Sequence, residues 1–156
     1  MKKIVLLMWI IIGILGFSEV SFKEIYLGMS KDEIIQKMGY DHQTNSSEII
    51  YFDIEINGIK MRKVRFLFLF NSLYTASFDM KPGNGTKVFN FLNNDFGKAL
   101  EIKSNDKLKV GIYSHIYSPK TYLLMADDKT TKESILQMLY EKDLNNVVKK
   151  LYIFRH

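Results

Sequence analysis

The stretch SEIIYFDIEINGIKMRKVRFLFLFNSLYTASFDM, residues 47–80, decides the fold because apolar and polar residues alternate along almost all of it. Alternation with a period of two is typical of β-strands that bury one face. Asn57–Gly58 interrupts the pattern and predicts a two-residue hairpin turn, since both residues tolerate a positive φ. This turn places Ile56 opposite Ile59. The stretch therefore predicts three antiparallel strands.

The apolar face of the second predicted strand changes parity between Met61 and Val64. An unbroken strand cannot make this change without exposing its phenylalanines, so we expect a β-bulge near Arg62–Lys63. With that bulge, Phe52 is expected to lie opposite Val64. A three-residue connection, 71–73, is expected to align the third strand with the second.

Two short helices are predicted on either side of these strands. Ser30 and Glu33 form a capping box, which predicts a helix beginning at about Lys31 and ending at Gly39. A second helix is expected from about Thr86 to Gly97, because apolar residues recur there with a helical period.

The C-terminal half predicts further strands at 109–118 and 121–126. A capping box of Thr130 with Glu133 then predicts a long C-terminal helix. The expected order is α-βββ-α-ββ-α, an α+β fold with a single antiparallel sheet and helices packed on one face. Both halves open on a short helix that ends at a glycine and is followed by antiparallel strands.

The segment LGMSKDEIIQKMG, residues 27–39, resembles the start of outer-membrane assembly lipoproteins of the SmpA/OmlA type and of small exported proteins with the β-lactamase-inhibitor-protein-like fold. The similarity extends loosely to the hairpin at Asn57–Gly58 and to the helix ending at Gly97. This resemblance implies a noncatalytic scaffold that binds another protein through an exposed sheet face. The chain has no cysteine to lipidate, so the resemblance does not imply outer-membrane anchoring. It also departs from the family pattern in having Gly97-Lys98-Ala99 in place of Gly-Lys-Pro.

The first residues, MKKIVLLMWIIIGILGFS, combine two lysines, an apolar run at 4–17 and a small residue at Ser18. This pattern predicts a signal peptide, 1–18, with cleavage after Ser18 and a single α+β domain over 19–156. The run is shorter than the roughly 20 residues that a spanning helix needs. We expect a periplasmic or secreted protein, and an inner-membrane signal anchor is the alternative.

Composition and charge limit the classes of partner. An apolar content of 47% with 13% aromatic residues predicts a folded core, and the net charge of +5 is small for a chain of 156 residues. This dispersed charge does not predict nucleic-acid binding. Contact with a membrane is expected only if the leader is retained. The partner expected is another envelope or secreted protein.

The sequence offers little for catalysis. His42, His115 and His156 have no second histidine or carboxylate at metal-ligand spacing, so no metal and no cofactor are expected. Ser114 and His115 are adjacent in a predicted strand and point to opposite faces, so they cannot act as nucleophile and base. We therefore expect a chain that is not an enzyme.

The candidate binding surface follows from strand parity. If Val110 and Ile112 face the helices, then Tyr113, His115 and Tyr117 face the opposite way. Tyrosine and arginine are enriched in protein interfaces. The predicted partner-binding residues are Tyr51, Arg62, Arg65, Tyr113, His115 and Tyr117. An alternative is that the C-terminal helix covers this face.

A second function from another class is a small-ligand or lipid carrier with an apolar cavity between sheet and helices. The feature that favours it is the high phenylalanine content. The residues concerned are Phe66, Phe68, Phe70, Phe89 and Phe91.

Overall fold

A computed structural model describes residues 20–153. The predicted signal peptide, 1–18, lies outside these residues. The helical elements are η1 (Phe22–Glu24), α2 (Lys31–Met38), α3 (Gly85–Asp95) and α4 (Glu141–Ile153). The strands are β1 (Gln43–Thr44), β2 (Glu48–Phe52), β3 (Glu55–Ile56), β4 (Ile59–Leu69), β5 (Ser72–Met80), β6 (Glu101–Ser104), β7 (Leu108–Ser114), β8 (Thr121–Asp128) and β9 (Ser134–Tyr140).

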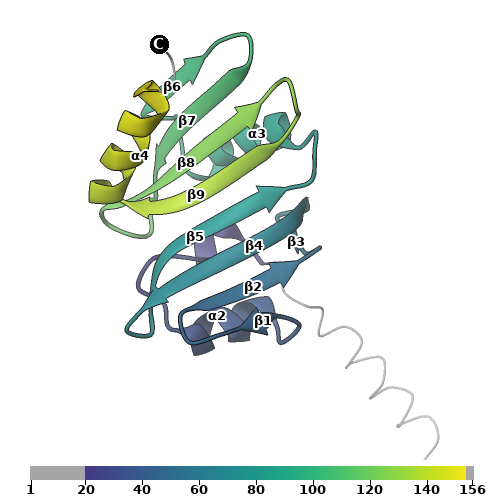
Figure 1. The fold of residues 1–156 in the computed structure, drawn as a ribbon, viewed down its shortest axis with the longest axis vertical. Helices are drawn as coiled ribbons and strands as arrows, with labels where there is room; N and C mark the ends of the chain where they lie inside the picture. The colour runs from purple at the N-terminus through teal and green to yellow at the C-terminus, as the bar shows by residue number, and fades with distance from the viewer. Residues whose placement is uncertain (1–19, 154–156) are drawn as a thin grey trace, which may run out of the picture.

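The nine strands form one antiparallel sheet (Figure 1), which confirms the predicted α+β class. The strand order is β1-β2-β4-β5-β9-β8-β7-β6, and β3 pairs with β4. Each half of the chain contributes a helix followed by its own antiparallel strands, and the last strands of the halves, β5 and β9, pair at the centre. The sheet has more strands than the sequence predicted, because β1, β6 and β9 were not expected and the first predicted strand is divided into β2 and β3.

The helix predicted after Thr130 is wrong over its first part, where the chain forms strand β9. The carboxylate of Asp128 accepts the backbone N–H groups of Thr130 and Thr131, so the predicted cap belongs to a turn. β9 buries Leu136 and Met138 on one face and Leu139 on the other, so its sequence is apolar enough to resemble a buried helix. The final helix, α4, begins only at Glu141.

The short helix α2 forms as predicted. The Ser30 hydroxyl accepts the backbone N–H of Glu33, and the Glu33 carboxylate accepts the backbone N–H of Ser30 at 2.7 Å. Gly39 ends the helix with a φ of 94°. The fully buried Ile34 attaches α2 to the core.

The β3–β4 hairpin also forms as predicted, with Asn57 and Gly58 at φ of 52° and 66° and Ile56 opposite Ile59. The register shift against β5 falls between Met61 and Lys63, which confirms the bulge. Its effect on β2 was predicted wrongly: Tyr51, and not Phe52, lies opposite Val64. The reason is that β2 and β3 pair with β4 in one continuous register. Asp53, between β2 and β3, has a positive φ of 51°, and the buried face changes parity there just as it does in β4.

The connection between β4 and β5 is shorter than predicted. Phe70 and Asn71 form a two-residue turn, and Leu69 pairs with Ser72. A second register shift, between Leu67 and Phe68, compensates by leaving an extra residue on β5. The apolar faces of the two strands therefore align through a bulge and not through a longer loop.

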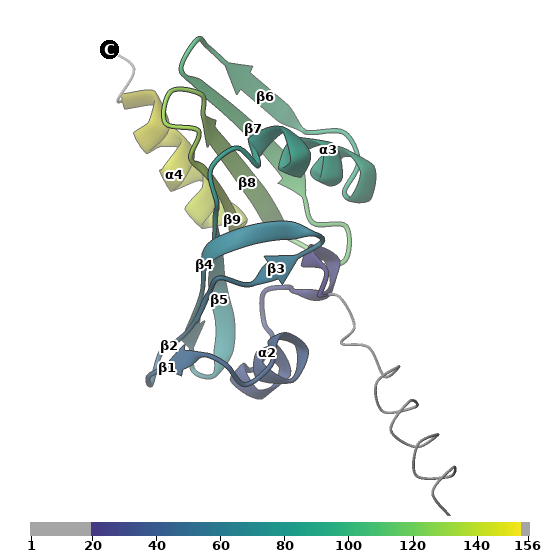
Figure 2. The same cartoon turned by 90° about the vertical axis from the view of Figure 1, so that its right-hand side faces the viewer.

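We call the face of the sheet that packs against α2 and α3 the inner face, and the opposite one the outer face. Figure 2 shows α2 and α3 on one side of the sheet and α4 on the other. The expected placement of helices on one face therefore holds for α2 and α3 but not for α4. In α4, Leu144 packs on the outer face against a small cluster that includes Val110, Ile112, Leu124 and Leu139.

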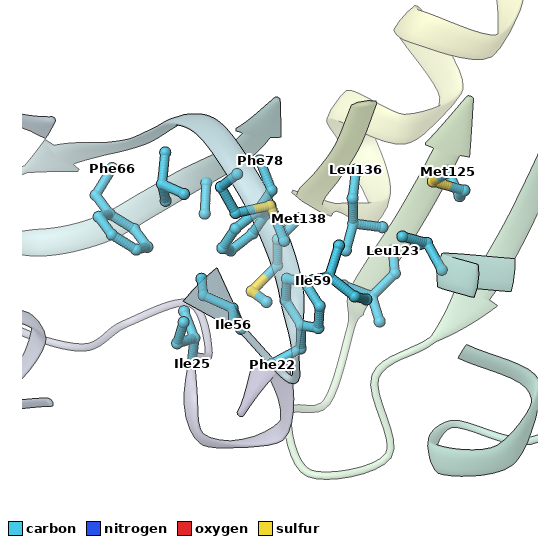
Figure 3. Packing of buried hydrophobic residues seen from close by; sticks show 14 of the residues in the cluster. Phe22, Ile25, Ile56, Ile59, Phe66, Phe78, Leu123, Met125, Leu136 and Met138 are labelled. Atoms are coloured by element: carbon cyan, nitrogen blue, oxygen red, sulfur yellow. The ribbon is translucent and has the colours of Figure 1, made fainter. Parts of the chain in front are cut away.

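The main core lies on the inner face and joins both halves of the chain (Figure 3). At its centre, the Phe22 ring of η1 meets the Phe78 ring edge-on at 5.0 Å between centroids and the Phe91 ring at 5.5 Å. Phe66 meets Phe78 at 5.9 Å, again edge-on. These contacts connect the N-terminal segment, the first half of the sheet and α3.

Candidate functional site

The outer face of β2, β4 and β5 is the best candidate binding surface, because no helix among residues 20–153 covers it. In β4, Val64, Phe66 and Phe68 are buried on the inner face, so the intervening residues point outward. Strand pairing extends this face to β2 and β5. We call this surface the outer-face patch. Its residues are Glu48, Ile50, Arg62, Arg65, Leu67, Leu69, Thr75, Ser77 and Asp79.

Two of the predicted residues, Arg62 and Arg65, lie on this patch, and both are held by ion pairs. The Arg65 Nε donates to Glu48 at 2.7 Å, and the Arg62 guanidinium donates to both carboxylate oxygens of Asp79 at 2.9–3.1 Å. Arg62 also reaches Glu133 at 3.4 Å. About half of each arginine side chain remains exposed. The ion pairs therefore fix the direction of the guanidinium groups and leave part of each available to a partner.

The ion pairs also fix the charge state of the patch. The hydrogen bond from Arg65, followed by one from Asn45, lowers the pKa of Glu48. The hydrogen bond to Asp79 raises the pKa of Arg62 further above its already high range. Exposed pairs of this kind add little to folding stability. Their main consequence is a fixed pattern of positive and negative groups over the sheet.

An open hollow of about 320 Å³ lies beside Arg62 at the end of the patch that is nearest to β8 and β9. Asp79, Asp128 and Glu133 line it together with the apolar side chains of Leu108, Ala126 and Ile135. Backbone hydrogen bonds from Thr131 and Thr130 lower the pKa of Asp128, so this carboxylate stays ionised. The hollow gives the outer face a local depression lined by both apolar and charged side chains.

Tyr51 was predicted to lie on this exposed surface, and that prediction is wrong. Tyr51 is only 1% exposed and points into the inner-face core, where its hydroxyl donates to the carbonyl of Gly39 at 2.8 Å. Burial raises the pKa of Tyr51 to about 12. The error follows from the register of β2, which is displaced by one residue from the expected one.

Tyr113 was also predicted to be exposed, and it is fully buried. The predicted alternation is correct, because Val110 and Ile112 do point away from Tyr113. Both faces of β7 are covered, however: α4 lies over Val110 and Ile112, and Tyr113 faces α3, with its hydroxyl 3.3 Å from Asn93. Burial raises the pKa of the Tyr113 hydroxyl.

His115 and Tyr117 lie in the loop between β7 and β8, away from the outer-face patch. His115 is 2% exposed, so its predicted exposure is wrong. Its Nε2–H donates to the carbonyl of Ile25 at 3.0 Å, and its Nδ1 accepts the backbone N–H of Tyr117 at 3.3 Å. This pair of bonds requires the neutral ring, and burial lowers the pKa of His115. Tyr117 itself is exposed, as predicted.

The phenylalanines that suggested a carrier have three different environments. Phe66, Phe68 and Phe89 are buried in the main core, and Phe91 is partly buried against it. Phe70 is 96% exposed at the turn between β4 and β5. The first four fill the space between the sheet and the helices by packing on their neighbours. This packing is the ordinary behaviour of a core and does not favour the carrier.

Sequence reasoning missed Phe70 as a surface residue because it was grouped with the core phenylalanines. Its position beside Asn71 was the available signal, since Asn is common in two-residue turns. Within residues 20–153, no group of three or more His, Asp and Glu side chains is arranged to hold a metal ion. None of the described helices is long and apolar enough to cross a membrane.

The geometry thus defines an open antiparallel α+β sheet with a partly charged, partly apolar outer-face patch. Comparisons of the chain with protein-family models, with curated proteins and with solved structures gave no match.

Proposed function

We propose that this chain is an exported, noncatalytic module of the bacterial cell envelope that binds another envelope or secreted protein through the outer-face patch. One observation carries the proposal. Helices α2 and α3 pack on the inner face, while α4 packs on the β7–β9 part of the outer face and contacts β5 at Tyr74, so among residues 20–153 part of the sheet is left without a covering helix.

The chemistry of the patch supports a protein partner. Arg62 and Arg65 present half-exposed guanidinium groups whose direction is fixed by their carboxylate partners. Leu69, at the end of β4 next to the β4–β5 turn, is 55% exposed. Arginine is enriched in protein interfaces, and fixed charges set the orientation of a partner.

The leader sequence supports export. Its two lysines, apolar run and small residue at Ser18 are typical of a cleaved signal peptide. The proposed location is the periplasm or the medium, with an inner-membrane signal anchor if the leader is retained. The resemblance of residues 27–39 to envelope scaffold proteins points in the same direction.

The test is cross-linking in intact cells, followed by recovery of the chain with its neighbours and reading of its N-terminus by mass spectrometry. A chain that starts at Glu19 is expected, and one that retains Met1 would contradict cleavage. The recovered partner is then purified and its Kd is measured for the wild type and for Arg65→Ala combined with Leu69→Ser. We expect the double variant to bind at least about tenfold more weakly.

A matched control is Lys37→Ala combined with Tyr40→Ser, which removes one exposed cation and one exposed apolar side chain from the α2 side of the molecule. This control is expected to bind as the wild type does. Circular dichroism melts check that both variants are folded. Equal affinities for the wild type and the outer-face variant would refute the proposal.

A further inference from the structure

The turn between β4 and β5 contains a residue that is unfavourable for folding. Phe70 and Asn71 are its two central residues, with φ of 51° and 61°. Turns with two positive φ angles prefer Asn, Asp and Gly. The other hairpin of this type in the first half of the chain follows that preference, with Asn57–Gly58.

Phenylalanine is a poor choice at this position for two reasons. A bulky residue with positive φ is rare, because its Cβ approaches the backbone too closely. The side chain is also 96% exposed, so it gains nothing from burial. Strained residues of this kind persist mainly at functional sites. The position of Phe70 therefore points to a role outside folding.

The backbone of this turn is held firmly on the α2 side. The Asn71 side-chain oxygen accepts the backbone N–H of Lys31 at 3.4 Å, and Leu73 exchanges backbone bonds of 2.7–2.8 Å with Met29 and Gly28. On the β2 side, the N–H of Phe68 donates to the carbonyl of Ser47 at 2.8 Å. Because the backbone of the turn is already ordered, a partner that binds the ring does not have to order the loop.

The surroundings of the ring indicate the kind of partner. Leu69 continues the apolar surface onto the outer-face patch, while Asn71 and Ser72 are neutral and polar. The nearby Lys31 ammonium donates to the carbonyls of Asn45 and Ser46 at 2.8 and 2.6 Å. Loops that dock on anionic membranes rely on lysine and arginine beside the apolar residues. Here the nearby ammonium is already bound to backbone carbonyls and the flanking turn residues are neutral, so a pocket on a protein fits the ring better.

We propose that Phe70 is an anchor residue that inserts into an apolar pocket of the partner protein, with Leu69 packing at the pocket's edge. This inference deepens the proposed function and rests on it. It makes the β4–β5 turn the end of the outer-face patch that contributes most to affinity, and it explains why the chain keeps a strained residue there.

The test is Phe70→Asn, which gives the turn a residue suited to positive φ and removes the ring. The partner recovered by cross-linking is purified, and its Kd is measured with the wild type, with Phe70→Asn and with the control Tyr40→Asn, which removes an aromatic ring that is 84% exposed on the α2 side. We expect Phe70→Asn to weaken binding at least about tenfold. Its Tm is expected to rise by about 2–4 °C because strain is relieved. Tyr40→Asn is expected to leave the Kd unchanged.

The other outcomes each overturn a defined part of the reasoning. If Phe70→Asn binds normally while Arg65→Ala with Leu69→Ser does not, the anchor is refuted and the proposed function stands. If neither variant loses affinity, both are refuted. A fall in Tm would show that Phe70 serves folding and would refute the anchor. If Phe70→Asn keeps partner binding but loses self-association in light scattering, the ring contacts a second copy of the chain instead. If it keeps partner binding but loses binding to phosphatidylglycerol vesicles, the ring contacts a membrane instead.

Discussion

Replacing Phe22 with alanine tests whether the N-terminal segment is part of the core. Phe22 is fully buried, and its ring contacts Phe78 from β5 and Phe91 from α3. Its backbone N–H donates to the side-chain oxygen of Asn57 at 2.9 Å, which holds η1 against the β3–β4 turn. A segment outside the core would show none of these contacts.

The expected loss of stability follows from this burial. Truncating a fully buried phenylalanine to alanine costs about 3–5 kcal/mol, from lost apolar transfer and from the cavity left behind. The two ring pairs account for roughly 0.5–1.5 kcal/mol each. Phe22→Leu keeps most of the buried area and is therefore expected to cost only about 1–2 kcal/mol. Since domains are stable by about 5–15 kcal/mol, Phe22→Ala removes a large share of the total.

The assay is urea unfolding followed by circular dichroism, on chains that begin at Glu19. The m-value is compared between variants to check two-state behaviour. Tyr40→Ala, which removes a side chain that is 84% exposed, is the control and is expected to change the free energy of unfolding by less than about 0.5 kcal/mol. A loss below about 1 kcal/mol for Phe22→Ala would refute the reasoning, because it would show that η1 does not pack as described.

Two further predictions concern the cover of the outer face and the buried histidine. Leu144→Ala is expected to lower the free energy of unfolding in urea by about 2–4 kcal/mol and to raise the binding of an apolar fluorescent dye, because Leu144 packs against Val110 and Leu124. The control is Asn145→Ala, at an exposed neighbouring residue. Equal losses of stability in the two variants would contradict the packing. The lowered pKa of His115 means that its contribution to stability is fully present above about pH 6.5 and is lost as the pH falls through the folded-state pKa. His115→Gln is expected to flatten the decline of unfolding free energy between about pH 7 and 5, and an unchanged slope in that variant would count against the neutral, doubly hydrogen-bonded ring.

Local chemistry made several elements predictable. The capping box of Ser30 with Glu33 forms because both of its hydrogen bonds lie within four residues. The Asn57–Gly58 turn forms because these residues accept a positive φ at little cost. The parity change at Arg62–Lys63 predicted the bulge, since exposing a run of phenylalanines costs more than inserting one residue.

The exposed residues of the candidate site were predictable only in part. Arg62 and Arg65 were placed correctly because β4 has one buried face. Tyr113 was not, because β7 is covered on both faces and alternation alone does not tell which helix covers which face. Phe70 was misplaced because its turn is one residue shorter than expected, and the compensating bulge lies on the neighbouring strand.

The sequence by itself determined the elements whose hydrogen bonds and φ angles are set by near neighbours: α2, the β3–β4 hairpin, the bulge in β4 and the α+β class. The tertiary structure alone decided that β9 is a strand, that α4 lies on the outer face, and that Tyr51, Tyr113 and His115 are buried. The physical reason is that burial depends on which element covers a face. Contacts between residues far apart in the chain decide which element covers a face, and the hydrophobic period of a single segment does not predict those contacts.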